Sequence, residues 1–287
     1  MPQTLARRAW TLYEPIHAIV YFAPESAEHY RAAGLRGGWM GYFASRSAAM
    51  GAAGAEVVTA VFHNFRPSMV ARAIPDAWHF SSPDRVLEAR LAVADAALRR
   101  LWGAEVDSDD VAEAAALTLE VAARLHGDGR PLYAGHAGLP MPDAPHLLLW
   151  HACTLLREHR FDGHVAALTV AGLSGLEALV TARAAGPGMD PATIQRVRGW
   201  TEEECEATAR RLRARGLLDA DNRLTVEGRV LRGSVEDTTD RLAADAWDAL
   251  DGAQRDRLFD LLRRLATLLE HPDGIRYPNP IGVDRPA

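Results

Sequence analysis

The chain has 287 residues, 48% of them apolar, and a formal net charge of −6. These values exclude a disulfide-stapled miniprotein and a disordered tail, and they predict one or two packed domains. All 32 basic residues are arginine. Schiff-base chemistry and the phosphate-binding loop both need a lysine, so these two classes are excluded. Two cysteines, Cys153 and Cys205, are too few for a disulfide framework or a four-thiolate zinc site.

No segment has the composition of a membrane span. The apolar stretch 16–23 is interrupted by His17 and bounded by prolines, and it is far shorter than the ~20 apolar residues that a spanning helix needs. The first ten residues are not followed by the apolar core and cleavage site of a secretory signal. We therefore expect a cytoplasmic protein with no membrane partner.

Helix signals dominate the first 186 residues. Ser82 followed by Pro83 is typical of a helix start, and Ser108 marks a second one. The loop residues of 126–145 predict irregular structure, and 160–163 predicts a helix break. Segment 56–62 fits a strand or a helix, because short apolar runs are ambiguous. The predicted helices cover 26–33, 39–50, 82–102, 108–125, 146–159 and 164–184.

The glycines and proline of 185–188 predict a boundary between two domains. The first, 1–186, is expected to be a helical ligand-binding or catalytic domain. The second, 187–287, is expected to be a winged helix-turn-helix with a C-terminal helix. The fold class predicted for the whole chain is mainly α, with one very small β-hairpin.

The second domain shows its elements more clearly. A short helix follows Asp190, and Thr201 with Glu204 forms a capping box for the next one. Two very short strands then flank the turn at residues 221–222. This order of helix, turn, helix, hairpin and helix is the layout of a winged helix. The last helix has an apolar stripe that we expect to pack on the first domain or on a second copy in a homodimer: Leu258, Leu261, Leu262, Leu265 and Leu268.

Segment 211–231, RLRARGLLDADNRLTVEGRVL, resembles the end of the recognition helix, the wing and the next helix of MarR-like winged-helix proteins. Three further segments resemble an actinobacterial family of helix-turn-helix proteins: GGWMGYFASRSAAMG (37–51), FHNFRPSMVARAIPDAW (62–78) and LLLWHACTLLREHRFDGHVAAL (147–168). The lysine-free, alanine-rich composition agrees with an actinobacterial source. The resemblance implies a winged-helix fold, and it brings no substrate or catalytic residue with it.

The charges of the second domain predict weak DNA binding. In a helix-turn-helix protein the first residues of the second helix meet the base edges. Here that first turn is acidic, from Glu202 to Glu206, and nine arginines against eight acidic residues in 189–234 leave a net charge of +1. The candidate DNA contacts are Arg210, Arg213 and Arg223. The alternative is a winged helix that serves for packing or dimerisation.

A cluster of aromatic and arginine residues predicts a ligand pocket in the first domain. Trp39, Tyr42 and Arg46 lie on one predicted helix, and His63-Asn64 ends the segment that follows. Aromatic walls with arginine donors suit a planar anionic ligand. A cation–π stack inside an ordinary core explains the same residues equally well.

Trp150 and His151, with Arg157 two turns later, form a second group of polar residues in an apolar helix. We expect this group to share one pocket with His63, and His63 or His151 is the candidate general base if the protein is an enzyme. The histidines lack the spacing of a helical zinc site, so no metal is predicted, and no cofactor is indicated.

Two functions therefore stay open at this stage, besides a pure interaction module. One is a regulator-type protein whose helical domain binds a small molecule and whose winged helix reports it. The other is an enzyme of specialised metabolism with a His/Arg-lined pocket, in which the winged helix is a scaffold. The sequence does not decide whether a reaction is catalysed.

Overall fold

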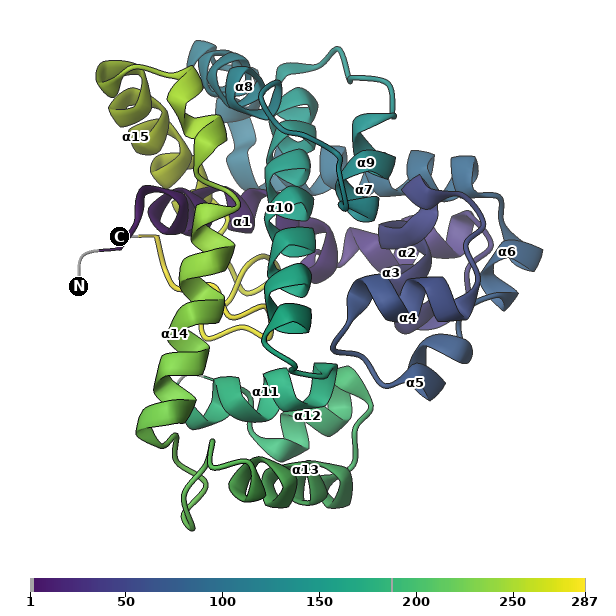
Figure 1. Ribbon diagram of the computed structural model, residues 1–287. Helices are drawn as coiled ribbons and strands as arrows, with labels where there is room; N and C mark the ends of the chain where they lie inside the picture. Colours follow the sequence, from purple (N-terminus) through teal and green to yellow (C-terminus); the bar gives the residue numbers. More distant parts are fainter. Residues whose placement is uncertain (1–2, 187, 287) are drawn as a thin grey trace.

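The computed structural model describes residues 3–186 and 188–286, and it is built from helices (Figure 1). Over these residues no extended strand forms. The predicted hairpin is reduced to one antiparallel bridge between Leu218 and Leu224. The mainly α fold is confirmed.

Two long helices organise the core. Helix α10 (Pro145–Val170) runs through the middle of the molecule and α1 (Leu5–Phe22) crosses it, as Figure 1 shows. Around them pack α7 (Pro83–Trp102), α8 (Asp109–Ala122) and α15 (Gly252–Leu268). One hydrophobic cluster extends through all five helices. The core therefore joins the first and the last helix of the chain.

Local capping places several of these helices where the sequence predicts them. The hydroxyl of Ser82 accepts from the amide of Arg85, and that of Ser108 accepts from Val111. These bonds satisfy amides that a helix start leaves without partners. Both predicted starts are confirmed.

The predicted break at 160–163 is wrong, since α10 continues through it to Val170. Packing outweighs the low helix propensity of Gly163: a Cβ there would lie 2.7 Å from the guanidinium of Arg130, so the glycine makes room for that side chain. Asp162, within this predicted break, is a buried residue of α10. Its carboxylate accepts from the backbone amide of Tyr133 at 3.0 Å.

Short helices cover the rest of the N-terminal half. The ambiguous segment 56–62 is helical, and the segment predicted as irregular, 126–145, contains a helix that starts at Pro131. The elements are α2 (Glu25–Ala32), α3 (Gly37–Ser47), the 3-10 turn Ala48–Met50, α4 (Ala55–Phe62), α5 (Pro67–Ala71), α6 (Asp76–Phe80), the 3-10 turn Gly103–Asp107 and α9 (Pro131–Ala137).

After α10 the chain bends by 93° and builds the lower end of the molecule in Figure 1. This end contains α11 (Gly175–Ala184), α12 (Pro191–Arg198) and α13 (Glu202–Ala214). Helix α14 (Val226–Arg241) then returns along α10, and a 3-10 turn (Asp245–Ala249) leads to α15. Both ends of the lower region are thus attached to the same long helix.

The apolar stripe of the last helix is covered within the chain, as one of the two expectations stated. Helix α15 packs on α1 and α8, and Leu258, Leu262 and Leu265 have no exposed surface. The indole of Trp102 donates to the carbonyl of Leu265 at 3.0 Å. Leu268 is 38% exposed, and its neighbour Leu269 is buried in its place.

The predicted domain boundary falls at residue 187, which lies outside the described residues. The division into 1–186 and 187–287 stays a prediction. The second of these units includes α15, although α15 belongs to the hydrophobic cluster that the N-terminal helices build.

Within the described residues no single helix is both long and apolar enough to cross a membrane; α10 and α11 pass that test only as a pair, across their 93° bend.

Replacing Leu262 by alanine should lower the free energy of unfolding by about 2–5 kcal/mol, because the fully buried side chain leaves a cavity between α15, α1 and α8. Leu268→Ala, at the 38% exposed position of the same helix, should cost less than about 1 kcal/mol. Urea unfolding followed by circular dichroism measures both. Equal losses for the two variants would contradict this packing.

Candidate functional site

Helices α12 and α13 form a helix-turn-helix. They are joined by three residues, Gly199, Trp200 and Thr201. Gly199 ends α12 in the left-handed conformation with φ +81°, which glycine adopts without steric cost. Thr201 starts α13 with the predicted capping box, in which it exchanges bonds with Glu204. A turn of this length with a glycine is typical of the motif.

The acidic first turn of α13 is partly neutralised by neighbouring arginines. Glu204 binds Arg66 at 2.9 Å in addition to capping the helix. Glu206 binds Arg213 at 2.9 Å and lies 3.8 Å from Arg210. Glu202 and Glu203 are exposed, and no ion pair is formed by either within the part of the chain that the structure describes.

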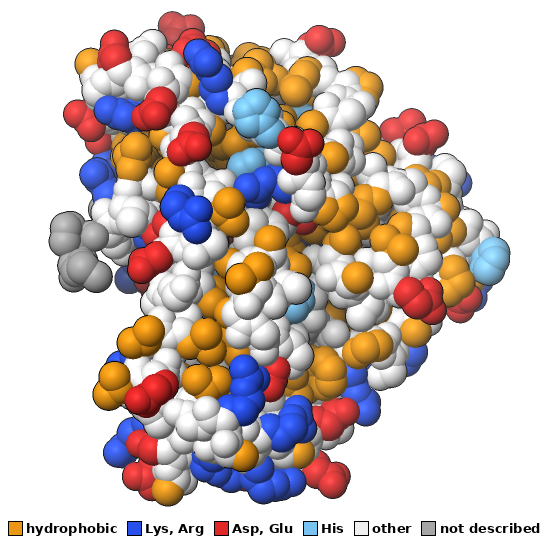
Figure 2. All heavy atoms as spheres, in the orientation of Figure 1, with side chains coloured by type: hydrophobic (Ala, Val, Ile, Leu, Met, Phe, Trp, Pro, Cys, Tyr) orange, Lys and Arg blue, Asp and Glu red, His pale blue; other side chains and the backbone are white. Residues whose placement is uncertain are grey.

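The three predicted DNA contacts differ in their freedom. Arg210 and Arg223 are exposed at the lower end, with 60% and 77% of their side-chain surface open. Arg213 is held between Glu206 and the side-chain oxygen of Asn222, so it braces the turn against α13. Figure 2 shows arginines gathered at this end with acidic side chains among them.

The helix-turn-helix is docked on the segment 64–69 of the N-terminal half. The indole of Trp200 donates to the carbonyl of Asn64 at 3.0 Å, and the amide of Arg66 donates to the carbonyl of Arg198 at 2.9 Å. The guanidinium of Arg198 lies 4.7 Å from the ring centroid of Phe65. These contacts hold the turn of the motif directly.

An aromatic cluster connects this segment to α3. Tyr42 has its ring centroid 5.6 Å from that of Phe65 and 5.2 Å from that of Tyr21. Phe43 and Phe62 complete the cluster, and Trp39 covers its edge at 41% exposure. Of the residues predicted for a pocket, this cluster brings together Trp39 and Tyr42, with Asn64 adjacent to Phe65.

Arg46 and Arg157, both predicted as ligand contacts, are instead tied into a buried ion cluster. Arg46 binds the carboxylate of Glu158 with two nitrogens, Nε at 3.0 Å and Nη2 at 2.9 Å. Arg157 binds Glu158 at 2.8 Å and Glu14 at 3.3 Å. Burial raises the pKa of Glu158, but Arg157 and Arg46 outweigh it and hold that pKa well below its usual value. The cluster joins α1, α3 and α10.

The structure places His63 and His151 beside different elements. His63 lies beside α11, where a Cβ on Gly175 would be 2.0 Å from the His63 carbonyl oxygen. His151 precedes the end of α10 at Val170 by 19 residues, a span of about 28 Å along the helix axis from that end. These contacts give no support to a site shared by the two histidines, which stays a prediction.

Both histidines are neutral near pH 7. Burial lowers the pKa of His63 and outweighs its hydrogen bond with the backbone of Leu173, which raises that pKa. Burial and then the charge of Arg90 lower the pKa of His151 to about 4. Trp150 donates to the carbonyl of His17 at 3.2 Å and serves the core. Among the described residues no group of three metal-type ligands comes together.

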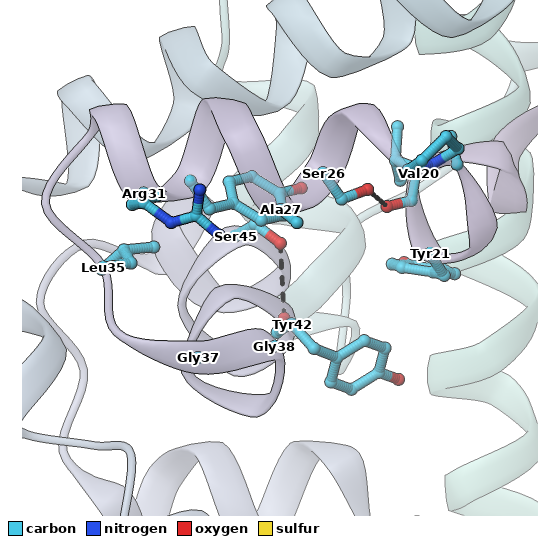
Figure 3. Close-up of a pocket in the computed structure, with 13 residues that line it drawn as sticks. Val20, Tyr21, Ser26, Ala27, Arg31, Leu35, Gly37, Gly38, Tyr42 and Ser45 are labelled. Atoms are coloured by element: carbon cyan, nitrogen blue, oxygen red, sulfur yellow. Dashed lines mark hydrogen bonds between the residues drawn. The ribbon is translucent and has the colours of Figure 1, made fainter.

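A cavity of about 270 Å³ lies between the end of α1, α2 and α3 (Figure 3). In Figure 3, Tyr21 and Tyr42 stand on one side and Arg31 with Leu35 on the other. Of the residues predicted as ligand contacts, Tyr42 is the one that lines it. The full lining is Val20, Tyr21, Ala23, Pro24, Ser26, Ala27, Tyr30, Arg31, Leu35, Gly37, Gly38, Tyr42 and Ser45.

Sequence reasoning missed Arg90, which lies beside this cavity. Its guanidinium is 1% exposed and donates from Nη1 to the carbonyl of Ser45 at 2.9 Å. The sequence did carry a signal, because Arg90 interrupts the apolar face of α7 between Val86 and Ala94 at helical spacing.

The chain belongs to a helix-turn-helix family, whose model matches residues 6–273. That family name suggests a DNA-binding regulator, and the match extends over both the N-terminal helices and the helix-turn-helix itself. Neither the search of curated proteins nor that of solved structures gave a match.

Glu158→Gln should lower the free energy of unfolding by about 3–5 kcal/mol at pH 7, because it leaves Arg46 and Arg157 without their shared buried charge. The matched control, Glu120→Gln, changes an exposed residue of α8 and should have almost no effect. Chemical denaturation measures both.

The pH dependence of stability tests the same variant in a second way. The pKa of Glu158 is depressed in the folded state, so its stabilisation is complete above the unfolded pKa of about 4.3 and is lost as the pH falls through the folded value. The stability gap between wild type and Glu158→Gln should therefore narrow below about pH 4. A difference in unfolding free energy that stays constant with pH would contradict the depressed pKa of Glu158.

Proposed function

We propose that this protein is a regulator-type helix-turn-helix protein that binds a small molecule among its N-terminal helices. Its MarR-like C-terminal region reports the ligand through weak contacts with DNA. The observation that carries the proposal is the direct docking of the helix-turn-helix on segment 64–69, which packs against the wall of the cavity.

A short chain of contacts supports the link between cavity and motif. Tyr42 lines the cavity, its ring meets Phe65 at 5.6 Å, and Phe65 meets Arg198 at the end of α12 at 4.7 Å. A ligand that displaces Tyr42 therefore acts on a ring that touches the motif. Such a ligand shifts the equilibrium between two arrangements of α12 and α13 only as far as its affinities for the two arrangements differ.

The charges at the lower end support weak rather than strong DNA binding. Arg210 and Arg223 are open to a phosphate, while Glu202 and Glu203 stand free at the end of α13 that enters the groove in related motifs. Neutralising phosphates with arginine supplies most of the affinity in such complexes. The free carboxylates oppose that term.

The variant Glu202→Gln/Glu203→Gln/Glu206→Gln should bind random duplex DNA about tenfold more tightly than the wild type at low salt, because three negative charges leave the surface and Arg213 is released from Glu206. Glu204 is kept because it caps α13 and binds Arg66. Fluorescence anisotropy over a salt series, on random and own-promoter duplexes, measures the affinities.

Arg210→Gln/Arg223→Gln is the opposing variant and should weaken binding and flatten the salt dependence. Glu120→Gln on α8 is the control and should leave both unchanged. Nanomolar, sequence-selective binding by the wild type would contradict weak binding. An affinity that none of these changes alters would contradict the assignment of this surface.

A further inference from the structure

We propose that the cavity between α1, α2 and α3 binds a small carboxylate with a flat apolar body, and that Arg90 receives the carboxylate. The proposal rests on the ligand-binding part of the proposed function and names the chemical class of the ligand.

The first observation is a buried guanidinium in which two nitrogens have no hydrogen-bond partner. Arg90 is 1% exposed and uses Nη1 on the carbonyl of Ser45, while its Nε and Nη2 are buried without a hydrogen-bond partner. No carboxylate of residues 3–186 or 188–286 forms an ion pair with it. A buried charge without a counter-charge is costly.

Arg46 of the same chain shows which group binds such a pair of nitrogens. Arg46 uses the same two nitrogens, Nε at 3.0 Å and Nη2 at 2.9 Å, to bind the two oxygens of Glu158. These nitrogens present parallel N–H groups that match the geometry of a carboxylate. Arg90 has the same pair of donors, and among the described residues neither has a hydrogen-bond partner.

The groups around Arg90 do not supply the missing negative charge. Burial, with Arg90 as the next cause, lowers the pKa of His136 to about 3 and that of His151 to about 4. Burial raises the pKa of Tyr21 to about 12 and also raises that of Tyr30. All four side chains are therefore neutral at pH 7, so none of them gives Arg90 a counter-charge. The rings of Tyr21 and Trp150, at 5.9 and 5.4 Å, offer it cation–π contacts instead.

Arg90 touches the cavity wall. Ser45, which accepts its hydrogen bond, lines the cavity, and so does Tyr21, whose ring centroid lies 5.9 Å from the guanidinium carbon. Tyr30 lines it as well, and its buried hydroxyl lies near the Ser45 side chain. Arg90 itself does not line the cavity, so a carboxylate reaches its guanidinium by entering between Ser45, Tyr21 and Tyr30.

The lining itself selects the rest of the ligand. It includes one cation, Arg31, and no aspartate or glutamate (Figure 3). Three tyrosines and the aliphatic side chains of Val20 and Leu35 form the walls. Rings of this kind pack best against a flat apolar group. An aromatic monocarboxylate meets both requirements.

The test compares benzoate with benzamide, its neutral counterpart of the same shape, by calorimetric titration of the full chain at pH 7. We expect benzoate to bind at least about tenfold more tightly, a ratio equivalent to about 1.4 kcal/mol. Arg90→Met should reduce benzoate to the level of benzamide and leave the melting temperature equal or higher, because it removes an unpaired buried charge.

Arg31→Gln changes an exposed side chain and gives a second test if Arg90→Met does not fold. It should weaken benzoate severalfold without changing benzamide, and Arg124→Gln, at an exposed position in the turn after α8, should change neither. Equal binding of the two probes, no binding of either, or full benzoate affinity in Arg90→Met would overturn the carboxylate site.

Repeating the DNA titration with saturating benzoate separates the two proposals. A changed DNA affinity supports both. Benzoate that binds as expected and leaves the DNA affinity unchanged supports the carboxylate site and overturns reporting through the helix-turn-helix. DNA binding that persists while benzoate fails to bind overturns the site alone.

Discussion

The buried carboxylate of Glu158 is the interaction on which the arrangement of the N-terminal half depends. It binds Arg46 of α3 and Arg157 of its own helix, and Arg157 also binds Glu14 of α1. Charges of this kind are tolerated in a core only when each has a partner at close range. Three helices must therefore keep one relative position. That position places Tyr42, four residues before Arg46, against Phe65, which in turn contacts Arg198 of the helix-turn-helix.

Local signals in the sequence were sufficient for much of the fold. The capping residues Ser82, Ser108 and Thr201 act within three residues of themselves, so the helices they start could be predicted without knowledge of the packing. Gly163 shows the limit. Its helix-breaking tendency is a local property, and the contacts that outweigh it come from Arg130, which is far away in the sequence.

The candidate site was less predictable for a related reason. Arg46 and Glu158 are 112 residues apart, so the sequence could present Arg46 only as an available donor and not as a satisfied one. Arg90 is the reverse case: its position in an apolar face was visible, but its lack of a partner is a property of the whole packed core. His63 and His151 were grouped by their apolar surroundings, which two separate parts of one core share.

The path of the chain at the lower end has a mechanical consequence. The region from α11 to α13 leaves α10 through a bend and comes back along α10 as α14. Because both of its ends are attached to α10, this region is more restricted than one joined to the core by a single linker. The turn at Trp200 is in addition bonded to Asn64, which attaches the region to the N-terminal half at a further place. In the proposed regulator, a small change at segment 64–69 would therefore tilt α13 rather than release it.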